Sequence, residues 1–381
     1  MPLPSTLLSE LTNLRHHLHK NPELSGKEKK TSATIIKFLE TCNPTSIISE
    51  IGGFGVAAVF DSGTDGPTLL LRADIDALPI QEESYHSYQS INRGVAHLCG
   101  HDGHTSILLG VAKLAGNSKP KKGKLVLLFQ PAEETGEGAA KVIHDEKFST
   151  IKPDIAYALH NLPGFEKGTV FYRQGTFASA STGVIVTLKG LPSHAAHPEN
   201  GNNPDLALAK IILQLNEITK THNFDQFTLL TVIHAKLGEV AFGTTPGNAV
   251  VMATLRTYLD TDMSELKQLV ESCVKTICDS TQITFELEYT EEFPATINNS
   301  QCVDILLEVC EKEKIGYQKL NNPFRWSEDF GHFSNICNSA FFGIGSGLNH
   351  PQLHNENYDF PDEIIESAVK IMVELTKFHL G

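Results

Sequence analysis

The sequence predicts an α/β fold, in which a mixed-sheet domain built from both ends of the chain is interrupted by a smaller α+β domain. Three observations carry this prediction. The 381 residues exceed most single hydrophobic cores, so two domains or one large insertion are expected. Strand and helix patterns alternate up to about residue 178, which is typical of an α/β layer. The order strand, helix, strand, strand, helix, strand then follows, and it matches the ferredoxin-like pattern.

The elements before residue 178 follow from apolar periodicity. A helix is expected at the N-terminus, with Ser5 or Thr6 as its cap. Apolar residues at helical spacing, closed by a glycine, predict a second helix over 104–116. Short apolar runs predict buried strands at 55–60, 68–76, 124–130 and 154–160.

The middle of the chain has a different pattern. Strands are predicted at 183–190, 226–235, 248–259 and 282–293, with helices at 203–220 and 262–280. Asp262 is the expected cap of the second of these helices. A helix (301–314), a strand (340–345) and a closing helix (362–379) complete the chain. We therefore predict one discontinuous domain of residues 1–178 and 293–381, with residues 179–292 inserted into it.

Composition excludes several classes of protein. A formal net charge of -14 argues against a nucleic-acid binder, which needs a basic face. The chain has no apolar run long enough to span a membrane and no signal-peptide pattern at its start. Its seven cysteines are scattered without a disulfide spacing, which favours a reducing compartment, so we expect a cytoplasmic protein.

Polar side chains gather where predicted strands end, which is where α/β sheets present their ligands. Asp74 and Asp76 end one strand, His160 ends another, and the segment "HLCGHDGH" (97–104) precedes a helix. Cys99 and His101 are good ligands for a borderline-soft ion such as Zn²⁺. A buried free thiol is the alternative for Cys99. The repetition of ligand types at several strand ends favours a metal site.

Glu133 and Glu134 follow a further strand, at 124–130. Adjacent carboxylates can face different ways, so that one binds a metal while the other holds a water as a general base. An ordinary solvated acidic turn is the alternative. The residues alone leave both interpretations open.

Eight segments together carry a family resemblance: "RHHLHKNPELSGKE", "LLLRADIDALPI", "HLCGHDGHT", "LLFQPAEETGEGA", "ALHNLPG", "GLPSHAAHP", "SEDFGHF" and "LHNENYDF". In this order they resemble the aminoacylase and carboxypeptidase G metallopeptidase superfamily. The most similar branch contains hippurate hydrolases, N-acetyl-diaminopimelate deacetylases and auxin–amino acid conjugate hydrolases. The resemblance covers nearly the whole chain. It implies a catalytic domain of zinc-exopeptidase type and an inserted lid and dimerisation domain.

The resemblance also implies a binuclear centre with two divalent ions per subunit, zinc first, with manganese, cobalt or nickel as alternatives. Cys99 would bridge the two ions. Glu134 and His354 would complete one ion, and His101 and His160 the other. Glu133 would be the general base that activates a water.

Further residues have weaker or more distant roles. Asp76 resembles a carboxylate that orients a metal ligand, whereas Asp74 is not expected to bind metal directly. By resemblance, His194 would reach a partner subunit's site and stabilise the oxyanion. Without the resemblance, the simpler interpretation of His194 is a histidine on a surface loop. Arg256 could bind a substrate carboxylate or make a structural ion pair. Packing or supporting roles are expected for His97, His104, His197 and His350, and Glu328 and Asp329 are candidates near the site.

The predicted function is a metal-dependent amidohydrolase that cleaves N-acyl amino acids, acting as a homodimer on a small molecule, with no nucleic-acid or membrane partner. A dipeptidase or aminopeptidase of the same superfamily is the first alternative. A non-catalytic metal-binding protein is the second, and the presence of Glu133 argues against it. A Cys99 nucleophile would leave Glu133 and Glu134 without a role.

Overall fold

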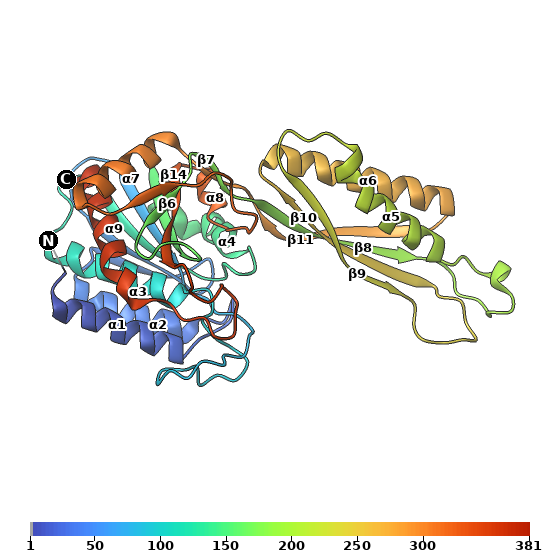
Figure 1. Cartoon of the computed structure of the whole chain (residues 1–381), viewed down its shortest axis with the longest axis horizontal. Coiled ribbons are helices and arrows are strands. Elements are labelled where there is room, and N and C mark those ends of the chain that lie inside the picture. Colours follow the sequence, from blue (N-terminus) through green and yellow to red (C-terminus); the bar gives the residue numbers. More distant parts are fainter. Residues whose placement is uncertain (1–2) are drawn as a thin grey trace. The chain divides into compact units, whose positions relative to one another are not determined.

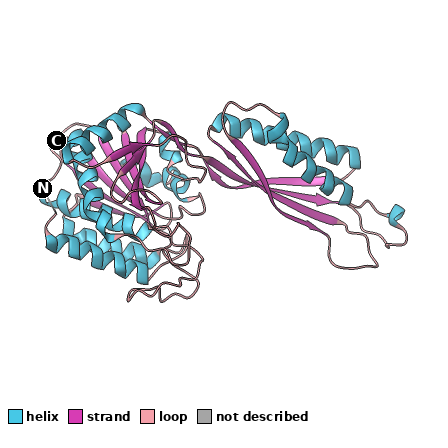
Figure 2. Ribbon diagram, in the orientation of Figure 1, coloured by secondary structure: helices cyan, strands magenta, loops and turns pink. Residues whose placement is uncertain are grey.

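A computed structural model describes residues 3–381 of the chain. The chain divides into two compact units, which are described separately. The first unit comprises Met1–Phe177, Thr296–Asn322 and Asp329–Gly381, and the inserted unit comprises Ala178–Ala295 and Pro323–Glu328. Figure 1 labels the elements of both, and Figure 2 shows that each consists of helices packed on a sheet.

The segment Pro323–Glu328 belongs to the inserted unit, although it was predicted to lie in the discontinuous domain of residues 1–178 and 293–381. Hydrogen bonds explain the difference. The amide and hydroxyl of Ser179 both donate to Phe324 O, at 3.1 and 2.8 Å. Arg256 donates to Arg325 O at 2.9 Å.

The first unit is built on an eight-stranded mixed sheet in the order β1-β2-β4-β3-β5-β14-β6-β13. The strands are β1 (Ser46–Ile51), β2 (Gly55–Asp61), β3 (Thr68–Asp74), β4 (Lys124–Gln130), β5 (Ile155–Pro163), β6 (Val170–Tyr172), β13 (Tyr317–Lys319) and β14 (Asn338–Gly347). The four central strands β4, β3, β5 and β14 run parallel. Their carboxyl ends therefore meet at one edge of the sheet. The short strands β7 (Gly175–Ala178) and β12 (Thr296–Asn298) form a separate pair.

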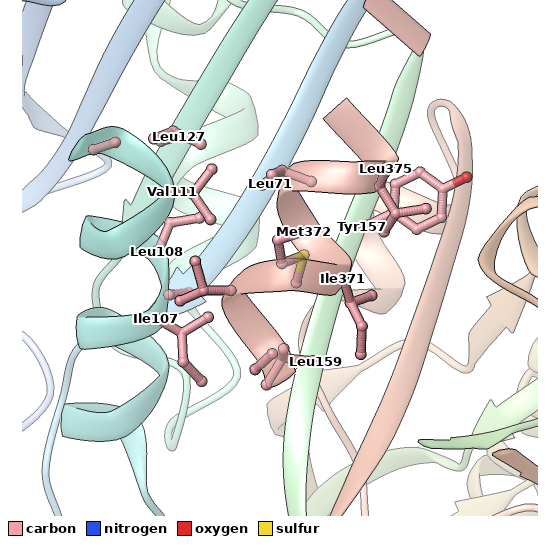
Figure 3. Packing of buried hydrophobic residues seen from close by; sticks show 14 of the residues in the cluster. Leu71, Ile107, Leu108, Val111, Leu127, Tyr157, Leu159, Ile371, Met372 and Leu375 are labelled. Carbon is pink, nitrogen blue, oxygen red and sulfur yellow. The ribbon is translucent and has the colours of Figure 1, made fainter. Parts of the chain in front are cut away.

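Seven α-helices accompany this sheet in the described part of the unit: α1 (Ser5–Lys20), α2 (Lys29–Leu39), α3 (His101–Asn117), α4 (Gly138–His144), α7 (Ser300–Glu313), α8 (Gly331–Ser334) and α9 (Ile365–Leu380). Figure 3 shows α3 and α9 side by side against the strands. Their buried side chains, among them Leu108 and Met372, meet Leu71 and Tyr157 of the sheet. Burial of this apolar surface is the main force that holds the layers together.

Helix starts differ from the predicted ones. Helix α1 begins at Ser5, so Pro4 rather than Ser5 or Thr6 occupies the cap position. Helix α3 begins at His101, three residues early, because Gly100 takes a φ of 93° just before it. Asp262 lies inside the first turn of its helix and accepts the Gln226 amide at 3.0 Å, so the predicted cap was wrong.

The inserted unit has the predicted ferredoxin-like order. Strands β8 (Ala180–Lys189), β9 (Thr228–Leu237), β10 (Asn248–Thr257) and β11 (Thr284–Phe293) alternate with helices α5 (Asp205–Thr221) and α6 (Asp260–Thr281). The sheet order is β11-β8-β10-β9, with every pair antiparallel. Both helices cover the same face of this sheet (Figure 1). Among residues 3–381, no helix combines the length and apolarity needed to cross a bilayer.

Candidate metal centre

The carboxyl edge of the central strands brings the five predicted ligands together. The ligand atoms of Cys99, His101 and His160 lie within 4.8 Å of one another, and so do those of Cys99, Glu134 and His354. Cys99 belongs to both groups. The two sets share one thiol, which is the arrangement that a bridging ligand requires.

Individual distances within the cluster are short. Cys99 Sγ lies 3.4 Å from His160 Nε2. The two oxygens of Glu134 lie 3.8 Å from His101 Nε2 and 3.7 Å from His354 Nε2. Cys99, His101 and His160 are buried, whereas the His354 side chain is 49% exposed. The cluster is therefore enclosed on one side and open toward solvent at His354.

Two buried polar atoms of the cluster have no hydrogen-bond partner among the described residues: His101 Nε2 and Glu134 Oε1. Leaving such atoms unpaired costs free energy, so they indicate a missing partner. A bound cation would provide a partner for both atoms, because a neutral imidazole nitrogen and a carboxylate oxygen are both ligands for Zn²⁺. The donor set of sulfur, nitrogen and oxygen fits two divalent cations of this kind.

Asp76 orients two of these residues at once. Its backbone oxygen and its Oδ1 lie 3.0 and 3.2 Å from His101 Nδ1, which leaves Nε2 of that ring facing the cluster. Its Oδ2 accepts the Glu134 amide at 3.0 Å and the Ser25 hydroxyl at 2.7 Å. A hydrogen bond to the far nitrogen of a histidine ligand is the usual way in which proteins fix its tautomer.

A second grouping, Asp74 with His101 and His104, also brings its ligand atoms within 4.8 Å. Two of its members, Asp74 and His104, are already engaged by other side chains of the protein. His104 contacts Asp74 through Nδ1 and Asn161 Oδ1 through Nε2, both at 2.6 Å. Asp74 also accepts from Arg72 at 2.6 Å. These contacts agree with a supporting role for Asp74 and His104.

Glu133 is buried next to the cluster, and its carboxylate lies within 4.8 Å of ligand atoms of both His101 and Glu134. The backbone at the site is unusual. Ala132 and His354 have φ values of 53° and 64°, which residues other than glycine rarely adopt. Such conformations persist only where the surroundings hold them, and they concentrate at functional sites.

The electrostatics of the cluster favour added positive charge. Burial, reinforced by Glu134 and Glu133, raises the pKa of the Cys99 thiol well above its usual value. Burial also raises the pKa of Glu134 to about 7, against the opposing effect of His101. Burial lowers the pKa of His101, but Asp74, Asp76 and Glu134 outweigh it and raise that pKa to about 10. Without a cation, Cys99 and His101 therefore hold protons at neutral pH.

Metal binding is accordingly expected to release protons. Cys99 and His101 must lose theirs before they can ligate, so metal affinity should increase as the pH rises from 6 to 8. The gain is about tenfold per pH unit for each proton released. Calorimetric titration of the metal-free protein in buffers of different ionisation enthalpy measures the number of protons released, and the same titration repeated across this pH range measures the affinity. An affinity independent of pH would contradict the assignment of these two ligands.

The inserted unit carries two further predicted residues. His194 lies on an exposed loop, where its Nδ1 accepts the Ala196 amide at 3.0 Å. Arg256 donates to Arg325 O and to Ser327 Oγ, so its contacts link strand β10 to the 323–328 segment. The roles of both residues toward a substrate stay predictions.

The remaining histidines differ in their surroundings. His197 is exposed beside Glu199, and His350 contacts Asp359 O at 2.6 Å. His97 is buried, and within residues 3–381 neither of its ring nitrogens has a hydrogen-bond partner. Asn161, whose backbone oxygen lies 2.8 Å from His160 Nδ1, was not predicted from the sequence. Its position directly after a predicted ligand was the available signal.

Comparison with known proteins finds relatives that match nearly the whole chain. The family model described as peptidase family M20/M25/M40 matches residues 70–377. The chain is 33% identical to the N-acetyl-L-cysteine deacetylase of Bacillus subtilis, over 98% of this chain and 89% of that protein. It is 31% identical to the hippurate hydrolase of Campylobacter jejuni, over 98% and 97% of the two chains. The fold matches a crystal structure of a Bacillus subtilis dinuclear metal-binding peptidase, with a TM-score of 0.83, 24% identity and 99% of each chain covered.

Proposed function

This chain belongs to the peptidase family M20/M25/M40, and we propose that it is a metal-dependent amidohydrolase that releases an amino acid from an N-acyl amino acid. One observation carries the proposal: five side chains of metal-ligating type and a separate buried carboxylate, Glu133, meet at the carboxyl edge of the sheet. The names of the deacetylase and the hippurate hydrolase support the acyl amino acid as the substrate class.

We propose that Cys99, His101 and His160 hold one cation and that Cys99, Glu134 and His354 hold the other. When bound there, such cations, with zinc as the first expectation, would polarise the amide carbonyl and make water more acidic. In this scheme Glu133 takes a proton from the attacking water and returns it to the leaving amine. Its burial excludes bulk water from that transfer. Asp76 keeps the His101 ring and the Glu134 backbone in place throughout.

The inserted unit supports the proposal of a homodimer. Strand β9 is an edge of its sheet, and Ile233 and Leu237 on it are 62% and 41% exposed. Val240 and Phe242, in the loop that follows, are fully exposed. Apolar side chains along an open strand edge favour association with another chain. The lid function of this unit, the reach of His194 into a partner's site and a cytoplasmic location stay predictions.

Hydrolysis of a small substrate panel tests the proposal. The panel contains N-acetyl, N-benzoyl and dipeptide substrates, each assayed with added metal and with chelator. We expect chelator-sensitive release of amino acid from an N-acyl substrate, because the ligands hold the cations that activate the amide. Turnover of the dipeptides alone would favour a peptidase. Absence of turnover across the panel, with two metals bound per subunit, would favour a non-catalytic metal-binding protein.

A further inference from the structure

A loop from the N-terminal region reaches the turn that carries Glu133 and Glu134. It lies between α1 and α2 and spans residues 21–28, and we call it the support loop. Leu24 forms an isolated parallel bridge with Ala77, and the Ala77 amide donates to Glu23 O at 2.9 Å. Ser25 donates to Asp76, which in turn accepts the Glu134 amide. The support loop is thus joined to the site through backbone as well as side chains.

Glu28 is the member of this loop that contacts the turn directly. Its side chain is fully buried, and its Oε1 accepts two backbone amides, those of Gly26 at 2.8 Å and Ala132 at 2.9 Å. Its Oε2 has no hydrogen-bond partner in the described part of the chain. Burying a carboxyl group this deeply costs free energy, and the hydrogen bonds from the two backbone amides offset part of that cost.

The Ala132 amide is a sensitive point of attachment. Ala132 has a φ of 53° and directly precedes Glu133, so its conformation sets the direction in which the Glu133 side chain leaves the backbone. The Ala132 oxygen accepts the Gly138 amide at 3.0 Å, which closes the other side of the turn. Without Glu28, the Ala132 amide would be buried and unpaired, and the turn could relax from its left-handed conformation.

We propose that Glu28 is a positioning residue for the Glu133–Glu134 pair, acting through the Ala132 amide. This inference rests on the proposed function for its effect on turnover. Glu28 contacts neither substrate nor cation in this scheme. It fixes the backbone from which the general base and one ligand project.

The test compares three variants of the full chain, with metal at saturation. Glu28→Met fills nearly the same space but has no oxygen acceptor, whereas Glu28→Gln keeps one. Glu23→Met is the control, because Glu23 lies in the same loop and accepts the Lys30 and Thr31 amides of α2, at 2.7 and 2.8 Å.

Glu28→Met should lower kcat by about 10- to 100-fold with KM within about twofold of the unaltered value. Glu28→Gln and Glu23→Met should stay within about threefold of the unaltered kcat. A Glu28→Met kcat equal to that of Glu23→Met, or a Glu28→Gln kcat as low as that of Glu28→Met, would overturn the proposal.

Hydrogen exchange separates this inference from the proposed function. Deuterium uptake in a peptide covering residues 131–138 should become at least about tenfold faster in Glu28→Met, and not in Glu23→Met. This readout needs no turnover, so it remains valid if no substrate in the panel is cleaved. Unchanged uptake in Glu28→Met would overturn the positioning role whatever the activity. If Glu28→Met does not fold, hydrogen exchange of the Ala132 amide in the unaltered protein tests the role instead. Exchange at the rate of an unstructured chain would overturn the role, and slower exchange would support it.

Discussion

Replacing Glu133 with glutamine is expected to remove turnover while leaving two metals bound per subunit. Glutamine has almost the same size but cannot accept a proton at neutral pH, so the proposed general base would be lost. Loss of general-base catalysis costs about 10²- to 10⁴-fold in kcat. Steady-state rates and metal analysis of the same preparation give both quantities.

The metal content decides between two roles for Glu133. Its carboxylate lies within 4.8 Å of ligand atoms of His101 and Glu134, so geometry alone also allows it to be a ligand. Loss of metal in Glu133→Gln would assign it to the ligands, and near-normal turnover would remove it from the mechanism. Glu137→Gln is the control, because Glu137 is an exposed acid of the same turn whose side chain pairs with Lys141.

Replacing Cys99 with alanine is expected to cost both metal affinity and activity. Cys99 is common to both candidate ligand groups, so in the proposed scheme its loss would remove a donor from each cation. The fall in affinity should exceed the roughly 10- to 100-fold that loss of an outer partner of a ligand typically costs. Competition with a chromogenic chelator measures the affinity, and the N-acyl substrate panel measures the activity.

Cys310→Ala controls for the loss of a buried thiol. Cys310 is fully buried in the hydrophobic core of the same unit, so its replacement affects packing without touching the metal centre. We expect unchanged metal affinity in that variant. If Cys99→Ala bound metal as tightly as Cys310→Ala, the bridging role would be wrong.

Much of the fold could be predicted because its signals are local. Apolar runs marked the central strands, and apolar residues at helical spacing marked α3, α5 and α6. The short strands β6, β12 and β13 were missed, since three residues carry no readable periodicity. The 323–328 segment was assigned to the wrong domain, because its hydrogen bonds are made with residues some 70 to 145 positions earlier.

The sequence by itself determined the family of the chain and which side chains stand at the ends of its buried strands. The thiol, imidazole and carboxylate groups directly follow apolar runs in the sequence, so their place at strand ends can be predicted from neighbouring residues. The family is recognised from the same segments. Only the tertiary structure decided which atoms meet. It places Cys99 in both candidate ligand groups, and it forms the hydrogen bonds of Asp76 with His101 and Glu134 and of Glu28 with the Ala132 amide. The physical reason is that the last contact joins residues 104 positions apart. Such contacts depend on how the sheet, helices and loops pack, which local periodicity does not encode.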